Sequence, residues 1–238
     1  MHAVYAIVFV LLAAVCGVCA WVSADGGVPG LFVAPAWTSV VFLSLSTAYA
    51  GLGPGVFGKR ATGRQALPNR VLFFPYLLLN AVVWRLHRLL SRERAFAEVV
   101  PNLFFGRRLT AAEARAAVSA VRWAACLDLA PEFTEAPALR ALPRYRSLPV
   151  LDATAPSVSQ LCEAVRWLRE SVAAGPTYVH CALGHGRTGT VVVAYLLATA
   201  EVSSVSDAVR RLRAHRPGVR LNRSQVSALR TFANSHRA

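Results

Sequence analysis

The first 58 residues are almost entirely apolar, and their pattern predicts two membrane-spanning helices. Residues 3–22 form an uncharged apolar run, and a helix of about 20 residues is about 30 Å long, the thickness of the hydrocarbon core of a bilayer. A second uncharged run covers residues 31–52. The polar turn between them, SADGGVPG, predicts a helical hairpin with both ends on one side of the membrane. A cleaved signal peptide is the alternative for residues 1–20, although no basic residue precedes the run and a second span follows it.

A third apolar stretch, residues 71–84, is too short for an ordinary span. As a helix it covers about 21 Å, and it contains Pro75 and Asn80. Basic residues flank it on both sides: Lys59, Arg60, Arg64, Arg70, Arg85, Arg88, Arg92 and Arg94. Because basic residues favour the cytoplasmic side, both flanks belong there, and we expect the stretch to lie in the membrane interface. A full crossing by residues 71–90 is the alternative, and it would export the rest of the chain.

From residue 96 onward the periodicity alternates between strand and helix patterns. We expect strands at 123–130, 148–156 and 176–180, and helices at 111–122, 157–174, 191–200, 207–215 and 222–235. Pro156 suits a first helical position, Ser157 and Gln160 have capping-box spacing, Gly175 is a stop signal and Asn222 is a cap. Alternating strands and helices predict an α/β domain with a largely parallel sheet. The predicted organisation is a membrane hairpin (1–58), a basic juxtamembrane segment with the third apolar stretch (59–95) and one globular domain (96–238).

The composition separates an apolar part from a basic one. The chain has 26 Lys plus Arg against 12 Asp plus Glu, a net charge of +14, and 55% hydrophobic residues, which excludes an acidic or disordered polypeptide. Basic residues gather in two blocks, 59–94 and 205–238. The five cysteines are an odd number and predict no disulfide framework. Cys16 and Cys19 have the spacing of a redox dithiol but lie inside an apolar span, where cysteine acts as a small hydrophobe.

The segment YVHCALGHGRTGT, residues 178–190, carries the chemistry. A strand leads into a glycine-containing loop, which leads into a helix, so backbone N–H groups and a helix N-terminus point into one concavity suited to a phosphate dianion. Cys181 opens this loop and Arg187 closes it. Such surroundings favour the thiolate, the nucleophilic form of cysteine. The planar guanidinium of Arg187 can hold two phosphoryl oxygens at once.

These residues resemble the Cys-x5-Arg-Ser/Thr signature of the protein tyrosine phosphatase superfamily, with His180 before the cysteine and Thr188 after the arginine. The stretch VHCALGHGRTGT looks most like the small atypical dual-specificity phosphatases. The resemblance covers about residues 99–232, because VPNLFFGRRL, LDLAPE and LPVLDATAPS follow in that family's order. It implies an α/β Cys-dependent phosphatase fold, with a central mostly parallel sheet flanked by helices, behind an all-α membrane region.

The resemblance also implies roles for individual residues. Cys181 would form a phosphocysteine intermediate, and Thr188 would assist departure of the thiolate when water hydrolyses it. Asp152, 29 residues before Cys181, would be the general acid on a mobile loop. His180 would orient the loop through hydrogen bonds. The phosphate would be cradled by Ala182, Leu183, Gly184, His185 and Gly186. No metal and no cofactor is required.

Each role has a structural alternative. Asp152 could instead cap the following helix, and His185 either contacts substrate or fills a solvent-facing position. Asp128 is a competing acid, but it is flanked by leucines in a strand, which favours a structural role. Cys181 and Arg187 together could form an inert anion site, which would make the protein a phosphate-binding membrane adaptor rather than an enzyme.

The substrate is predicted from the surroundings of the domain. Anionic lipid attracts basic residues by about 1 kcal/mol each, and the two basic blocks would hold a cytoplasmic catalytic domain against the bilayer. The C-terminal block contributes Arg210, Arg211, Arg213, Arg216, Arg220 and Arg223. This arrangement favours a lipid phosphate monoester of the phosphatidylglycerophosphate or phosphoinositide type, and a phosphoprotein is the alternative. Two predicted spans and the lack of a recognised nucleic-acid fold argue against nucleic acid as partner.

Overall fold

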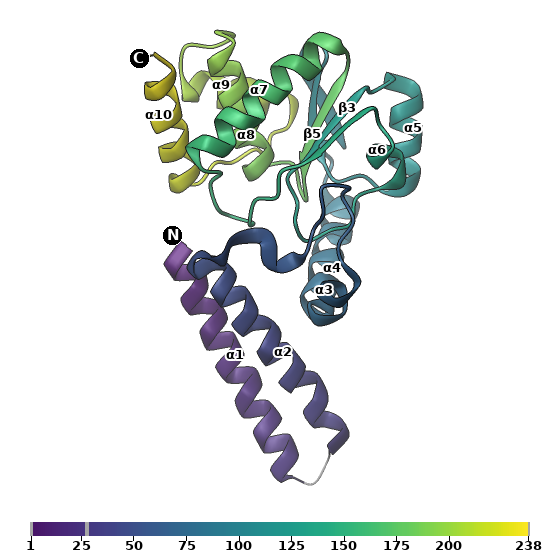
Figure 1. Ribbon diagram of the computed structural model, residues 1–238, viewed down its shortest axis with the longest axis vertical. Helices are drawn as coiled ribbons and strands as arrows, with labels where there is room; N and C mark the ends of the chain where they lie inside the picture. The colour runs from purple at the N-terminus through teal and green to yellow at the C-terminus, as the bar shows by residue number, and fades with distance from the viewer. Residues whose placement is uncertain (1, 27–28, 238) are drawn as a thin grey trace.

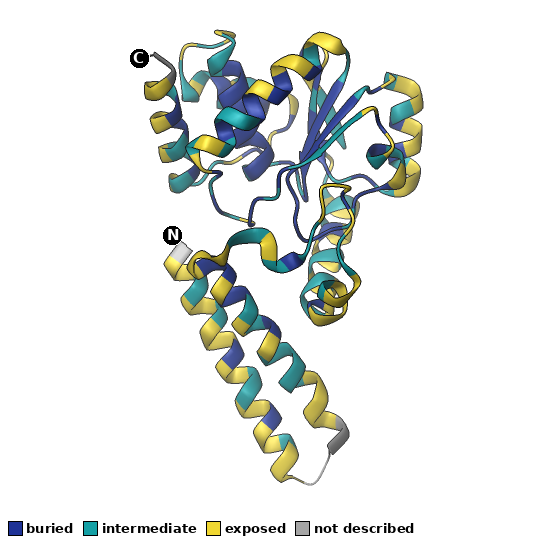
Figure 2. Cartoon of the chain, in the orientation of Figure 1, coloured by how far each residue is buried: buried dark blue, intermediate teal, exposed yellow. Residues whose placement is uncertain are grey.

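The computed structural model describes residues 2–26 and 29–237, and it consists of a helical hairpin below an α/β domain (Figure 1). Helices α1 (His2–Asp25) and α2 (Pro29–Thr47) pack side by side, and the last residues of α1 and the first of α2 lie at the end away from the domain. Two segments, Ala3–Asp25 and Leu31–Phe57, are long and apolar enough to cross a membrane. Figure 2 shows that most of the hairpin surface is exposed. Exposed apolar surface of this extent is typical of helices that contact lipid or another protein.

The chain leaves the hairpin through a π-helical turn, η1 (Ala48–Leu52), and a 3-10 turn, η2 (Gly53–Phe57). The third apolar stretch then forms two helices, α3 (Leu67–Leu72) and α4 (Phe74–Leu90). Pro75 stands in the first turn of α4, where its missing N–H costs no hydrogen bond. The helical part is therefore longer than residues 71–84 and is broken at Phe73, which caps α4.

The α/β domain is built on a five-stranded sheet. Its strands are β1 (Phe96–Val100), β2 (Leu103–Arg107), β3 (Ala125–Asp128), β4 (Arg144–Ser147) and β5 (Thr177–Cys181), in the order β1-β2-β5-β3-β4. Only the β1–β2 pair is antiparallel, and the other three pairs are parallel. The predicted α/β fold with a mostly parallel sheet is confirmed. The parallel strands deliver their carboxyl ends, including Cys181, to one edge of the sheet.

Helices cover both faces of this sheet. They are α5 (Ala111–Val121), α6 (Pro137–Arg140), α7 (Val158–Ala174), α8 (Gly186–Ala198), α9 (Val205–His215) and α10 (Arg223–Arg237). The larger core cluster joins α7, α8 and α10 to the sheet, and a smaller one lies under α5 and α6. Ser157 and Gln160 form the predicted capping box of α7, and the Gly175 stop is confirmed as its C-cap. The Asn222 side chain accepts a hydrogen bond from Gln225 N, as predicted for α10.

Two expectations about local structure are wrong. The strand expected at 148–156 lies earlier, at β4, although Leu148 N and Val150 N still donate to the carbonyls of Asp128 and Leu129. Pro149 between them has no N–H, so the ladder cannot continue as a regular strand. Pro156 precedes the α7 cap rather than opening the helix. Helix α8 begins at Gly186, so the end of the motif forms its first turn and residues 191–198 continue it, as the predicted order of strand, loop and helix requires.

Candidate active site

The motif forms a tight loop between β5 and α8. Cys181 is the last residue of β5 and is 3% exposed, and its Sγ accepts a hydrogen bond from Gly184 N at 3.3 Å. Gly184 has a φ of 76°, and a Cβ there would lie 2.1 Å from Arg216 Nη1 and 2.2 Å from the Gly106 carbonyl oxygen. Both the conformation and the space require glycine. The loop is thereby held in a shape that directs an amide at the sulfur.

Arg187 is buried and fixed by its own chain. Its Nη1 and Nη2 donate to the two carboxylate oxygens of Glu132 at 3.0 and 2.7 Å, and Nη1 also donates to the Val150 carbonyl at 3.0 Å. Burial alone would lower the pKa of Arg187, but Glu132, Asp152 and Cys181 outweigh it and hold that pKa well above its ordinary value. Glu132 lies in the LDLAPE stretch, but the sequence pattern assigned it no role. The rule that a buried arginine needs a carboxylate partner could have pointed to it.

In the first turn of α8, two buried polar atoms have no hydrogen-bond partner among the described residues. They are Arg187 Nε and the Thr188 hydroxyl oxygen. A buried donor without a partner costs about 1–3 kcal/mol, and such groups in a native structure mark a strained or ligand-binding position. Both follow Cys181 in the same loop and helix turn. A bound phosphoryl oxygen could accept from Arg187, and a thiolate or phosphate oxygen could accept from Thr188.

Asp152 lies beside this group on the loop between β4 and α7. Its side chain is 64% exposed, and Oδ1 is 3.0 Å from Arg187 Nη2. The helix-capping alternative is wrong, because Ser157 caps α7. The main-chain carbonyl of Asp152 accepts a hydrogen bond from the Tyr49 hydroxyl at 3.0 Å, so the π-helical turn that leaves the hairpin contacts the loop of the expected acid. Nothing in the sequence pattern indicated Tyr49.

The two histidines of the motif have structural partners. His180 is fully buried, and its Nδ1 lies 3.3 Å from the Cys181 carbonyl oxygen. His185 Nε2 lies 2.8 Å from the Glu93 carboxylate, so a solvent-facing filler role is wrong. Glu93 also pairs with Arg216 at 3.1 Å, and the buried Arg216 donates to the carbonyls of Leu183 and Gly184. Glu93 and Arg216 therefore support the motif loop through these contacts, and the sequence pattern did not identify either as a site residue.

The site opens into a cavity of about 230 Å³. It is lined by residues of the motif together with Glu132 and Asp152. Helix α4 also lines it, through Asn80, Val83 and Trp84. A helix from the segment expected to lie on the membrane is therefore part of the pocket of the α/β domain.

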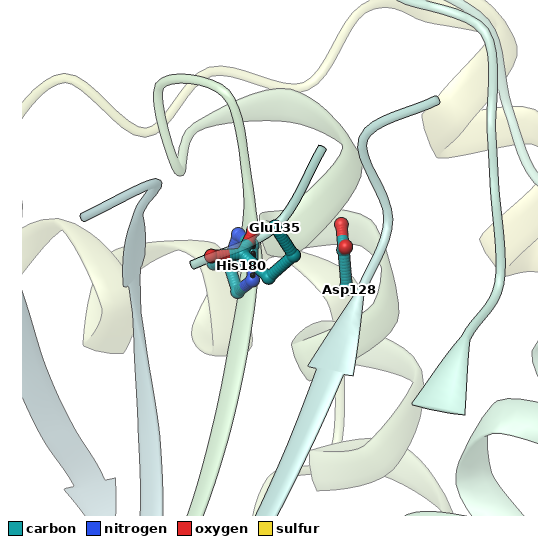
Figure 3. A group of neighbouring side chains, drawn as sticks. All are labelled: Asp128, Glu135 and His180. Carbon is teal, nitrogen blue, oxygen red and sulfur yellow. Dashed lines mark ion pairs between the residues drawn. The ribbon is translucent and has the colours of Figure 1, made fainter. Parts of the chain in front are cut away.

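A buried polar cluster lies beneath the loop (Figure 3). Asp128, Glu135 and His180 place potential ligand atoms within 4.8 Å of one another. However, the ammonium of Lys59 lies 2.5 Å from Asp128 Oδ2 and also donates to the Ala130 carbonyl. The Tyr145 hydroxyl donates to the same carboxylate oxygen at 2.6 Å. Asp128 is thus neutralised and hydrogen-bonded by its own chain, so a metal ion here would have to displace Lys59. This supports the structural role expected for Asp128.

Comparison with known families agrees with this geometry. Residues 125–235 match the family model for the dual specificity phosphatase catalytic domain. Phosphatidylglycerophosphate phosphatase PTPMT2 of Arabidopsis thaliana is 36% identical over 80 residues, which are 33% of this chain and 35% of that protein. Phosphatidylglycerophosphate phosphatase PTPMT1 of the same plant is 36% identical over 76 residues, 32% of this chain and 22% of that protein. The matched segment thus spans about a third or less of each relative.

Solved structures match over a longer part of the chain. The crystal structure of Tk-PTP in the active form has 27% sequence identity and a TM-score of 0.54, and the match covers 59% of this chain and 97% of that one. The crystal structure of PTPMT1 in complex with PI(5)P has 18% identity and a TM-score of 0.55, and the match covers 60% and 97% of the two chains. The second match, at this identity, shows the fold alone. The predicted resemblance to the protein tyrosine phosphatase superfamily is confirmed for the α/β domain.

Proposed function

We propose that this chain, whose α/β domain contains a dual specificity phosphatase catalytic domain, is a membrane-anchored phosphomonoester hydrolase that works through a phosphocysteine intermediate. The observation that carries the proposal is the group formed by Cys181, Arg187 and Thr188. The sulfur accepts a hydrogen bond from the Gly184 N–H, and the helix turn that follows carries two buried polar atoms, Arg187 Nε and the Thr188 hydroxyl oxygen, that have no partner among the described residues. A phosphoryl group in the loop would satisfy both of them. A carboxyl group that can serve as the acid for turnover lies beside them, since Asp152 Oδ1 is 3.0 Å from Arg187 Nη2.

The chemistry follows from these positions. The Cys181 thiolate attacks phosphorus, the bond from phosphorus to the leaving oxygen breaks, and protonated Asp152 gives its proton to that oxygen. Glu132 holds Arg187 in place through both Nη atoms, and the Nε–H, which has no partner among the described residues, is left to donate to an equatorial oxygen, where charge gathers in the transition state. Water then attacks the phosphocysteine while Asp152 takes its proton, and the thiolate leaves with help from the Thr188 hydroxyl. The products are the alcohol and inorganic phosphate.

A lipid substrate is the version of this function that we favour. Two plant relatives are phosphatidylglycerophosphate phosphatases, and two apolar helices of spanning length precede the domain. The basic residues that flank α4 would keep the domain on the cytoplasmic, anionic face. Two basic residues do not contribute to such contact, which corrects the expectation from sequence. Lys59 pairs with Asp128 in the interior, and Arg216 is fully buried against the loop.

Turnover of a generic aryl phosphate by the full-length protein in detergent tests the enzyme proposal. We expect activity that vanadate inhibits, that chelators leave unchanged, and that Cys181→Ser abolishes. Retained turnover in Cys181→Ser would contradict the mechanism. Absence of turnover in the wild-type chain would favour the phosphate-binding adaptor.

The substrate class is tested by comparing mixed micelles that contain phosphatidylglycerophosphate with phosphotyrosine peptides under the same conditions. We expect a higher kcat/KM on the lipid. Equal or higher values on the peptides would contradict the lipid preference.

A further inference from the structure

Helix α4 has two different faces. Its outward face carries apolar side chains that are between 42% and 79% exposed: Phe74, Leu78, Leu79, Val82, Leu86, Leu89 and Leu90. Its inward face, which holds Tyr76, Asn80 and Trp84, is turned to the protein. Because a helix repeats every 3.6 residues, each set of side chains forms a continuous stripe along α4. The inward stripe packs on the domain, and the outward stripe is free to contact an apolar surface. Phe74 on this face stacks on Trp37 of α2, with ring centres 6.1 Å apart, so the stripe continues the apolar surface of the hairpin, and we expect a membrane surface to cover both.

The inward face is fixed to the catalytic domain by Trp84. This residue is 6% exposed, and its indole N–H donates to the Arg108 carbonyl at 3.2 Å. The Arg108 guanidinium lies 5.1 Å from the centre of the Trp84 ring, and Phe133 packs beside it with 6.5 Å between ring centres. At the next turn, His87 contacts His185 of the motif loop with ring centres 5.3 Å apart. The helix is therefore held in a defined position against the pocket.

Asn80, Val83 and Trp84 line the cavity. Val83 is also 49% exposed, and it differs from the similarly exposed Val82 in that Val82 is not among the lining residues. Positions three and four residues apart share one helix face. Asn80 is the polar member of an otherwise apolar wall. One of its amide N–H groups donates to the Tyr76 carbonyl at 2.8 Å, and the carboxamide still has a second N–H and an acceptor oxygen to offer. A small number of polar groups in an apolar lining is the usual means by which a pocket fixes a ligand's orientation.

We propose that α4 is the substrate-selecting wall of the active site, with Asn80 and Val83 contacting the alcohol part of a lipid phosphomonoester. This inference rests on the proposed phosphatase function. Cys181 and Arg187 hold the phosphoryl group, and α4 lines the same cavity, so the leaving group that shares this cavity lies within reach of the α4 side chains. Asn80 hydrogen-bonds a hydroxyl or phosphodiester oxygen of the head group, and Val83 packs against its carbon atoms. The acyl chains remain in the bilayer at the outward face of the same helix.

The test uses full-length protein in mixed micelles and two substrates, phosphatidylglycerophosphate and 4-nitrophenyl phosphate. In Asn80→Leu and Val83→Trp, we expect kcat/KM for the lipid to fall at least tenfold more than kcat/KM for the aryl phosphate. The matched control is Val82→Trp, one position along on the outward face, which we expect to stay within twofold of wild type on both substrates. Equal losses on the two substrates, or an equal effect of Val82→Trp and Val83→Trp on the lipid, would overturn the proposal.

A second readout separates this proposal from the proposed catalysis. Iodoacetamide alkylation of Cys181, followed by peptide mass spectrometry, reports occupancy of the pocket without turnover. We expect phosphatidylglycerophosphate micelles to protect Cys181 in wild-type protein and in Val82→Trp, and to protect it at least tenfold less in Asn80→Leu. If the lipid protects Cys181 only when Asn80 is present, but no hydrolysis occurs, the catalytic function is refuted and the role of α4 in substrate selection stands. Equal protection in all variants would refute the wall whatever the catalytic result.

Discussion

Lys59 joins the segment that leaves the apolar hairpin to the centre of the α/β domain, and its replacement tests that junction. The ammonium and the Asp128 carboxylate are 2.5 Å apart, with side-chain exposures of 1% and 0%. Replacing one partner of a buried pair leaves an uncompensated charge and costs about 3–5 kcal/mol. For a chain of this size 1 kcal/mol shifts the Tm by about 2–4 °C. We therefore expect Lys59→Met to lower the Tm by about 6–20 °C.

The assay is thermal unfolding of the full-length protein in detergent, followed by tryptophan fluorescence. In a double-mutant cycle, Lys59→Met combined with Asp128→Asn should be less destabilised than the sum of the single variants, by about 1–3 kcal/mol. The control is Glu170→Gln, which breaks the exposed Arg144–Glu170 pair and should cost at most about 1 kcal/mol. A Tm of Lys59→Met within about 2 °C of the wild-type Tm, a loss of about 1 kcal/mol or less, would refute the claim that the buried Lys59–Asp128 pair holds the two segments together.

The pH dependence of this pair has a definite sign. Burial alone would raise the pKa of Asp128, but Lys59 and His180 outweigh burial and lower it. A carboxylate whose pKa is lower in the folded than in the unfolded state contributes stability above the unfolded pKa, and that stability is lost as the pH falls through the folded pKa. The Tm difference between wild type and Lys59→Met should accordingly be full at neutral pH and shrink in acid below about pH 4.

Three further changes test the site and its support. Asp152→Asn should lower kcat on alkyl phosphates by about 10²–10⁴-fold and on aryl phosphates less, because an alkoxide needs the proton more; equal losses in steady-state kinetics would argue against Asp152 as the acid. Glu132→Gln keeps the shape but removes the charge that holds Arg187, so kcat/KM should fall about 10–100-fold; an unchanged value would mean that Arg187 needs no fixed partner. Burial alone would raise the pKa of Glu113, but hydrogen bonds from Arg107 and Thr110 lower it to about 2. Glu113→Gln should therefore cost about 1–3 kcal/mol at pH 7, and a Tm difference that persists undiminished at pH 2 would contradict this assignment.

Much of the site could be predicted because it is local in sequence. Cys181, Arg187 and Thr188 lie within one strand, loop and first helix turn, so their spacing alone brings them together. Helix ends that depend on adjacent side chains, such as the Ser157–Gln160 capping box, were predicted for the same reason. The expected strand at 148–156 was misplaced because an apolar run can pair along β3 without forming a regular ladder once Pro149 interrupts it.

The missed residues are those that only the tertiary fold brings to the site. Glu132 meets Arg187 across 55 positions, and Glu93 meets Arg216 across 123. In the sequence these are ordinary charges, because nothing local shows which opposite charge each will meet. Asn80 was noted as a polar interruption of an apolar stretch. Its position in the cavity follows from the packing of Trp84 on the domain, which helical periodicity cannot reveal.

The most direct test of the central claim is to trap the covalent intermediate. Full-length protein is mixed with ³²P-labelled aryl phosphate, denatured in SDS within milliseconds, digested and mapped by mass spectrometry. The account predicts phosphate on Cys181, at no more than one per chain, and none in Cys181→Ser. Steady turnover with no labelled protein, or label on a residue other than Cys181, would contradict it.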